Sequence, residues 1–219
     1  MEKAIEINHS DTNANILKNA DSAFSLKNYK ETFELYSEAL KAEPHNAHAI
    51  LYRSFSSAMQ STAEEFRTEE TNAAVIAALE LQHNKYGDSQ PYYDFCYDMI
   101  TYMTLLSDHI AALCIPVTQA EVKAPPRFGA NRNNGKKNPA PEQGSASRSG
   151  ITGCCELCRN AVITALKQVT DFSGFSDDFW ERTHTLIDKC CTYRERSKMQ
   201  PDPELLNLLA TVDGIKANH

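Results

Sequence analysis

The stretch KNYKETFELYSEALKAEPHNAHA, residues 27–49, constrains the fold more than any other part of this 219-residue chain. From Tyr29 to Leu40, apolar side chains recur at intervals of three and four, the spacing that turns one face of an α-helix toward a core. Pro44 has no amide hydrogen and disfavours helix at the residue before it, so the helix is expected to end there. A second helical pattern starts at Ala47. The stretch therefore predicts a helix, a short turn and another helix.

This pattern resembles the tetratricopeptide repeat, a helix–turn–helix unit of about 34 residues. With Asn13 as the first repeat position, the small residues Ala20 and Ala39 fall where two antiparallel helices approach closely. Tyr29 and Tyr36 fall where aromatic side chains fill the space between neighbouring helices. The proline after the second helix also matches.

A second repeat begins well over residues 47–58 and then degrades. Phe66 occupies a repeat position where a small residue is expected. At the next such position, the chain does have a small residue, Ala73. From residue 90 onward no repeat motif is recognisable. The resemblance to the family therefore covers about residues 13–75.

The resemblance implies a protein that binds a protein or peptide, or a second copy of itself, in a groove lined by the first helix of each repeat. Apolar residues at these positions can equally pack in the core, and the sequence leaves that choice open. The carboxylate-binding subtype is excluded, because an acidic residue stands where that subtype has an amide. The groove positions are Leu17, Asp21, Phe24, His48, Tyr52 and Phe55.

Helical spacing also runs through the rest of the chain, with no strand-like alternation. The sequence predicts an all-α fold of antiparallel helical hairpins, stacked as a tetratricopeptide-like solenoid of about eight helices. Ser61 with Glu64, Ser176, and Asp202 are predicted N-caps. The predicted helices are 13–26, 30–43, 46–59, 62–85, 90–114, 153–169, 177–196 and 203–215.

Residues 116–150 differ in composition from the rest of the chain. They hold five of the nine prolines and four of the eight glycines, with six basic against two acidic residues. Such a segment buries too little apolar surface to offset its chain entropy, so it is predicted to be a disordered basic loop. It separates a repeat-like part, 1–115, from a C-terminal helical part, 151–219, expected to pack on the same array.

Charge and hydropathy exclude several functions. The net charge of −7 includes the basic segment, so the remainder of the chain is more acidic still, which argues against nucleic-acid binding. No apolar run of about 18 residues is apparent, so no membrane-spanning helix is expected. The N-terminus is too polar for a secretory signal, and a cytoplasmic location is predicted.

Five of the seven cysteines occur in CCELC, 154–158, and KCCTY, 189–193. Folding this region as a helical hairpin would bring them together at one end. Three interpretations remain: packing in the core, a structural zinc site, and thiol chemistry favoured by the start of a helix. The zinc ligands would be Cys155, Cys158 and Cys190, with Cys191, Cys154 or His184 as the fourth.

No motif typical of an enzyme occurs in the sequence. It contains no Gly-rich phosphate loop, no HExxH and no GxSxG, and its histidines are scattered. The predicted function is a non-catalytic interaction or scaffold protein. The alternative is a zinc- or thiol-dependent regulator that uses the cysteine cluster.

Overall fold

The computed structural model describes residues 2–123 and 142–217, and the side chains of 12–120 and 145–217. All regular structure in these residues is helical, which confirms the predicted all-α class. The elements are α1 (Glu2–Ser25), α2 (Tyr29–Ala42), α3 (Ala47–Ala58), α4 (Thr68–Tyr86), α5 (Gln90–Lys123), α6 (Glu142–Gln168), the short 3-10 helix η1 (Phe172–Gly174), α7 (Asp177–Arg196) and α8 (Pro203–Lys216).

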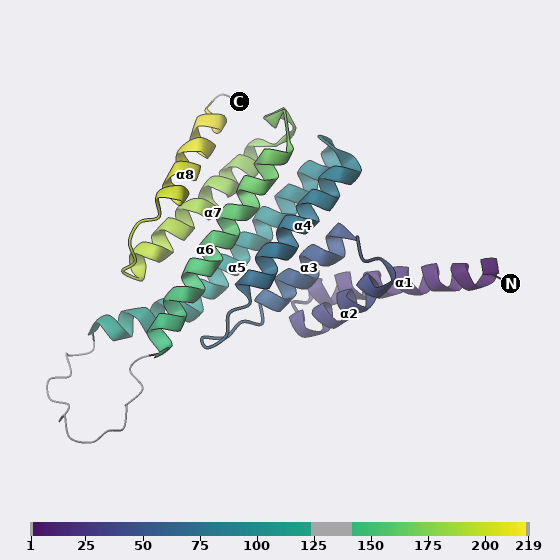
Figure 1. The fold of residues 1–219 in the computed structure, drawn as a ribbon, viewed down its shortest axis with the longest axis horizontal. Coiled ribbons are helices and arrows are strands. Elements are labelled where there is room, and N and C mark those ends of the chain that lie inside the picture. The colour runs from purple at the N-terminus through teal and green to yellow at the C-terminus, as the bar shows by residue number, and fades with distance from the viewer. Residues whose placement is uncertain (1, 124–141, 218–219) are drawn as a thin grey trace, which may run out of the picture.

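The helices pair in chain order, and the principal contacts join each helix to those one or two places along the chain. Among the odd-numbered helices, α1 contacts α3, α3 contacts α5, and α5 contacts α7; among the even-numbered ones, α4 contacts α6 and α6 contacts α8. Figure 1 shows the α1–α2 hairpin at one end of this row and α8 at the other. The contact between α5 and α6 is the most extensive, so these two helices form the centre of the molecule.

One hydrophobic core runs through the whole row. It extends without interruption from Ala20 on α1 to Val212 on α8, so residues 1–115 and 151–219 share it. Burying one large apolar side chain contributes about 1.5–3 kcal/mol. The largest fully buried side chains include Trp180, Tyr36, Tyr92, Phe55 and Phe179.

The first hairpin has the local features that its sequence predicts. Ala20 and Ala39 are fully buried between the helices. The Asn28 and Asn46 side chains cap α2 and α3 by accepting backbone N–H bonds from the first helical turn. Helix α2 ends two residues before Pro44, as expected from the missing amide hydrogen.

Two lysines terminate helices in a backbone conformation that favours glycine. Lys27 follows α1 with φ of 59°, and Lys198 follows α7 with φ of 57°. In each case the next residue's amide bonds back to the last helical turn, at 3.0 and 2.9 Å.

Because a side chain is strained in this conformation, Lys27→Gly and Lys198→Gly should each raise the unfolding free energy by about 0.5–1 kcal/mol. Urea denaturation would measure this. Lys18→Gly, inside α1, is the control and should lose about 1 kcal/mol. A loss at all three positions would contradict the predicted strain.

Helix α4 begins six residues later than predicted, at Thr68. The Ser61 hydroxyl accepts a hydrogen bond from the Arg67 amide at 3.2 Å. The Thr62 hydroxyl accepts from the amides of Glu64 and Glu65, both at 3.3 Å. These bonds hold residues 60–67 as a loop. The predicted capping box of Ser61 and Glu64 was therefore wrong: both side chains belong to this loop rather than to a helix start.

The predicted bounds of the basic loop, 116–150, were too wide. Helices α5 and α6 enter this range from both sides and leave 124–141, where the predicted disorder lies outside the described residues. Packing explains the start of α6. Ser147 is fully buried, and Gly150 lies so close to Phe66 that an added Cβ would stand 2.8 Å from the ring. Small residues that the composition assigned to a loop thus lie in helix α6, where they allow it to pack closely against Phe66.

Within the described residues, one helix, α5, is long and apolar enough to cross a membrane, over Gln90–Ala120. The same helix contacts α3, α4, α6 and α7 and contributes much of the core. Central helices of soluble proteins meet this criterion too. The expectations of no membrane segment and of a cytoplasmic location stay predictions.

Candidate functional site

A group of aromatic and acidic side chains lies where α1, α3 and α5 meet. Tyr36 of α2 joins it from the neighbouring helix. We call this group the tyrosine–aspartate cluster. Its members are Asp21, Tyr36, His48, Tyr52, Asp98 and Tyr102.

Asp21 is at the centre of the hydrogen bonds on the α1 side. Its carboxylate accepts the Tyr36 hydroxyl and lies 3.2 Å from His48 Nε2. The His48 ring stacks on Tyr52 with 3.9 Å between centroids. The Asp21 side chain nevertheless remains 56% exposed, so it is free to meet a further group from solvent.

The tyrosines of the cluster form a rigid platform. The hydroxyls of Tyr52 and Tyr102 lie 2.8 Å apart and join α3 to α5. Phe24 packs edge-on against both rings, at centroid distances of 4.5 and 5.1 Å. Burial, followed by hydrogen bonding, raises the pKa of Tyr36 and Tyr52, so their hydroxyls stay protonated.

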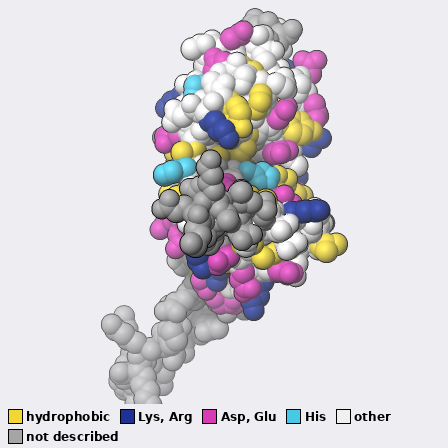
Figure 2. All heavy atoms as spheres, turned by 90° about the vertical axis from the view of Figure 1, so that its right-hand side faces the viewer, with side chains coloured by type: hydrophobic (Ala, Val, Ile, Leu, Met, Phe, Trp, Pro, Cys, Tyr) yellow, Lys and Arg dark blue, Asp and Glu magenta, His cyan; other side chains and the backbone are white. Residues whose placement is uncertain are grey.

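Asp98 contributes the second carboxylate of the cluster. It is half-buried on α5, and burial raises the pKa of its carboxyl, an effect that nearby His48 partly opposes. Within the described part of the chain, Asp98 forms no ion pair. Acidic side chains are also spread over the face seen from the α1–α2 end (Figure 2). A cation brought by another molecule would relieve the cost of burying this carboxylate.

The predicted groove residues divide between surface and core. Asp21 and His48 are exposed, whereas Leu17 and Phe24 are partly buried. Phe55 is fully buried and Tyr52 nearly so. A role for Phe55 as a groove-lining contact is therefore wrong, because α5 covers it.

Sequence reasoning missed Asp98 and Tyr102, although they complete the cluster. The helix that carries them has no recognisable repeat motif, so the repeat pattern assigns neither residue to the groove. The available signal was their spacing of four residues, which places a carboxylate and a hydroxyl on one helix face. Nothing local shows that this face meets His48.

The cysteine cluster is buried between α5, α6 and α7. The Cys155 thiol donates to the Cys190 carbonyl at 3.7 Å, so these two cysteines meet as the predicted hairpin requires. The Cys158 thiol lies 4.0 Å from the Met103 carbonyl. Cys154 is also buried. Cys191, by contrast, lines a separate cavity between α7 and α8, because adjacent helical residues point in directions about 100° apart.

The structure bears on the two chemical interpretations of these cysteines. Cys154 and Cys155 lie in the middle of α6 rather than in its first turn, so the predicted stabilisation of a thiolate by the helix start does not apply. Hydrogen bonding to a neighbouring thiol, together with burial, raises the pKa of Cys155 and of Cys158. Among the described residues, no group of three or more His, Cys, Asp or Glu side chains is placed to hold a metal. His184 instead lies 3.3 Å from Asp213.

Thiol labelling should separate Cys191 from the other cysteines. Cys191 is partly exposed and the remaining six are buried, so under native conditions a maleimide should label one thiol at least about 100-fold faster than the rest. Mass spectrometry of the intact chain would count the adducts. Cys191→Ser should remove the fast adduct; two or more fast adducts in the unaltered protein would contradict the burial of the cluster.

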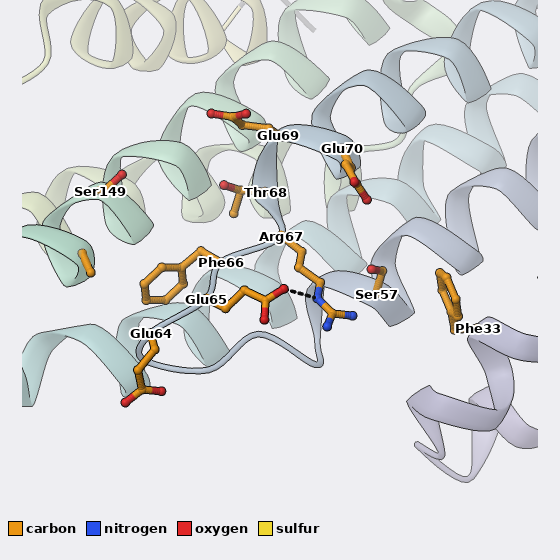
Figure 3. A pocket seen from close by; sticks show the side chains of 11 residues that line it. Phe33, Ser57, Glu64, Glu65, Phe66, Arg67, Thr68, Glu69, Glu70 and Ser149 are labelled. Atoms are coloured by element: carbon orange, nitrogen blue, oxygen red, sulfur yellow. Dashed lines mark hydrogen bonds and ion pairs between the residues drawn. The ribbon is translucent and has the colours of Figure 1, made fainter. Parts of the chain in front are cut away.

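Two cavities lie away from the tyrosine–aspartate cluster. One, of about 600 Å³, lies between α7 and α8 and includes Cys191, Met199 and Leu206. The other, of about 580 Å³, lies beside the α3–α4 loop and is lined by several glutamates (Figure 3). We call the latter the glutamate pocket.

Comparison with protein-family models and with curated proteins found no match for this sequence. The resemblance to the tetratricopeptide repeat therefore rests on the residues of the first two hairpins. The fold defines an all-α protein of consecutive helical hairpins, with a cluster of acidic and aromatic side chains where α1, α3 and α5 meet.

Proposed function

We propose that this is a non-catalytic interaction protein of the tetratricopeptide type, stacked as a solenoid. The support is the order of the hairpins, whose principal contacts join near neighbours in the chain, as in repeat arrays. The close packing of Ala20 and Ala39 adds to it. Such proteins bind partners over an extended surface, here the surface around the tyrosine–aspartate cluster.

The partner that this surface fits best is a protein or peptide segment with a lysine or arginine. The observation that carries this proposal is Asp98, a half-buried carboxylate without an ion pair among the described residues. A charge-assisted hydrogen bond from a cation would be worth about 1.5–3 kcal/mol there. Exposed Asp21 offers a second carboxylate nearby, and the acidic body of the protein would attract a basic segment.

An apolar contact is available next to these carboxylates. Leu105 lies seven residues after Asp98, on the same face of α5, and is 46% exposed. On the α7 side, Asp108 is already occupied by Lys189 at 2.8 Å and by the Tyr193 hydroxyl. The proposed binding surface therefore has at Asp98 a carboxylate without an ion pair among the described residues, and at Leu105 an apolar contact.

Asp98→Asn should stabilise the folded protein and weaken partner binding. The raised pKa means that the folded state holds this proton more tightly than the unfolded state does. Stability therefore falls as pH rises from about 4 through the raised pKa, and the penalty is fully present at neutral pH. The amide removes this penalty, so the melting temperature at neutral pH should rise and this pH step should disappear.

Binding is tested with synthetic peptides of about 12 residues that share their apolar residues and carry lysine, glutamine or glutamate at the charged positions. Fluorescence anisotropy should show binding of the lysine peptide, weakened about tenfold by Asp98→Asn. Glu80→Gln, an exposed carboxylate of α4, is the control. Equal affinity for the lysine and glutamate peptides, or an Asp98→Asn variant that binds normally, would refute the proposal.

A further inference from the structure

The glutamate pocket is a second recognition surface, separate from the tyrosine–aspartate cluster. Its volume is about 580 Å³, and Figure 3 shows Phe66 and Phe33 on opposite sides of it. Helix α6 contributes Ala146 and Ser149 to the lining. The acidic side chains come from the α3–α4 loop and the first turn of α4, and they are Glu64, Glu65, Glu69 and Glu70.

The pocket has an excess of unpaired negative charge. Arg67 is the one cation among the described residues that line it, and its Nε pairs with Glu65 at 3.3 Å. Within the described part of the chain, Glu64, Glu69 and Glu70 form no ion pair. Carboxylates gathered in a hollow raise the local negative potential and attract cations.

The walls of this pocket are held in place by close packing. A Cβ added at Gly153 would stand 2.5 Å from Thr68 Oγ1, so α6 approaches the start of α4 as closely as a glycine permits. The neighbouring Gly150 contacts Phe66 in the same way. The loop itself is fixed by the bond from the Arg67 amide to Ser61. The pocket therefore exists before a ligand arrives.

We propose that the glutamate pocket binds the chain's own basic segment, residues 124–141. This segment reads APPRFGANRNNGKKNPAP and contains Arg127, Arg132, Lys136 and Lys137 but no acidic residue. Its charge is thus opposite to that of the pocket. This inference does not depend on the function proposed for the tyrosine–aspartate cluster.

The chain connection places the basic residues within reach. The segment leads directly into α6, and Ser149 at the pocket lies about 10 Å along the helix from its first residue. Lys137 is five residues before that start, a span of up to about 17 Å when extended. Lys136 and Lys137 can therefore meet Glu69 and Glu70. A tether this short gives an effective concentration in the millimolar range, which favours the chain's own segment over an outside peptide.

Limited trypsin digestion tests this proposal, because trypsin cleaves after the four basic residues of the segment. Mass spectrometry would follow the cleavage rates at low salt. The double variant Glu69→Gln/Glu70→Gln should be cut within 124–141 about tenfold faster than the unaltered protein, and about 0.5 M salt should have a similar effect. The control Glu80→Gln/Glu156→Gln changes two exposed carboxylates outside the pocket and should be cut at the original rate. Circular dichroism would check that each variant is folded.

Equal cleavage rates in the unaltered protein and in Glu69→Gln/Glu70→Gln would overturn the proposal. So would protection that increases with protein concentration over about a hundredfold range, since it would assign the segment to a second copy. Asp98→Asn should leave the protection unchanged. The two surfaces are thus tested separately.

Discussion

Replacing Phe55 with alanine should lower the free energy of unfolding by about 3–5 kcal/mol. The Phe55 side chain is fully buried on α3. Its ring packs against Phe24 at 5.7 Å, Tyr29 at 5.9 Å and Tyr102 at 5.3 Å between centroids. Truncation leaves a cavity among rings that hold one another in place, so the site cannot collapse around it. Urea denaturation followed by circular dichroism would measure the loss.

The matched control is Leu26→Ala in the α1–α2 turn, where the leucine is 81% exposed. This change should stay within about 0.5 kcal/mol of the unaltered protein. A Phe55→Ala variant as stable as Leu26→Ala would place Phe55 at the surface. The groove position that the repeat resemblance assigns to it would then be restored.

Replacing Gly174 with alanine should cost about 2–3 kcal/mol. The added Cβ would lie 1.9 Å from Cε2 of Tyr93, well inside contact distance. The tyrosine ring has little room to move, because its hydroxyl donates to the Asp171 carbonyl at 3.2 Å and the ring packs edge-to-face with Phe175, at 4.8 Å between centroids. The turn between α6 and α7 must therefore shift away from α5, and thermal unfolding would report the loss.

Gly214→Ala provides the comparison for Gly174→Ala. An added Cβ at Gly214 meets nothing within 4 Å, and the residue lies inside α8. Alanine there should stabilise the protein by about 0.5–1 kcal/mol through its higher helix propensity. If the two substitutions had the same effect, the close contact between Gly174 and Tyr93 would be refuted.

Features that depend on a few adjacent residues were predictable from the sequence. Helix α7 occupies the predicted range, 177–196. The Ser176 hydroxyl caps it by accepting the Phe179 amide at 3.2 Å, and Asp202 caps α8 in the same way. Periodicity and capping are local, so no knowledge of the tertiary structure is needed to infer them.

Features that depend on contacts between distant segments were not predictable. Gly150 belongs to a composition typical of a loop, yet it lies in a helix because Phe66 packs on it. The repeat pattern predicts Phe55 to line the groove, but in the fold Tyr102 of α5 packs against its ring and buries it. The grouping of Asp98 with His48 likewise joins helices about 50 residues apart in the chain, and no pattern within either helix encodes it.

Site-specific photo-crosslinking at Leu105 tests the proposed binding surface most directly. Leu105 would be replaced by p-benzoylphenylalanine, and the protein irradiated with the lysine peptide, with the glutamate peptide or with neither. Position 86, where the native tyrosine is 40% exposed at the end of α4, carries the photoreactive residue in the control. The proposed function predicts a crosslink to the lysine peptide at position 105, lost in Asp98→Asn and absent at position 86. Equal crosslinking at both positions, or none at 105 with a peptide that binds, would contradict it.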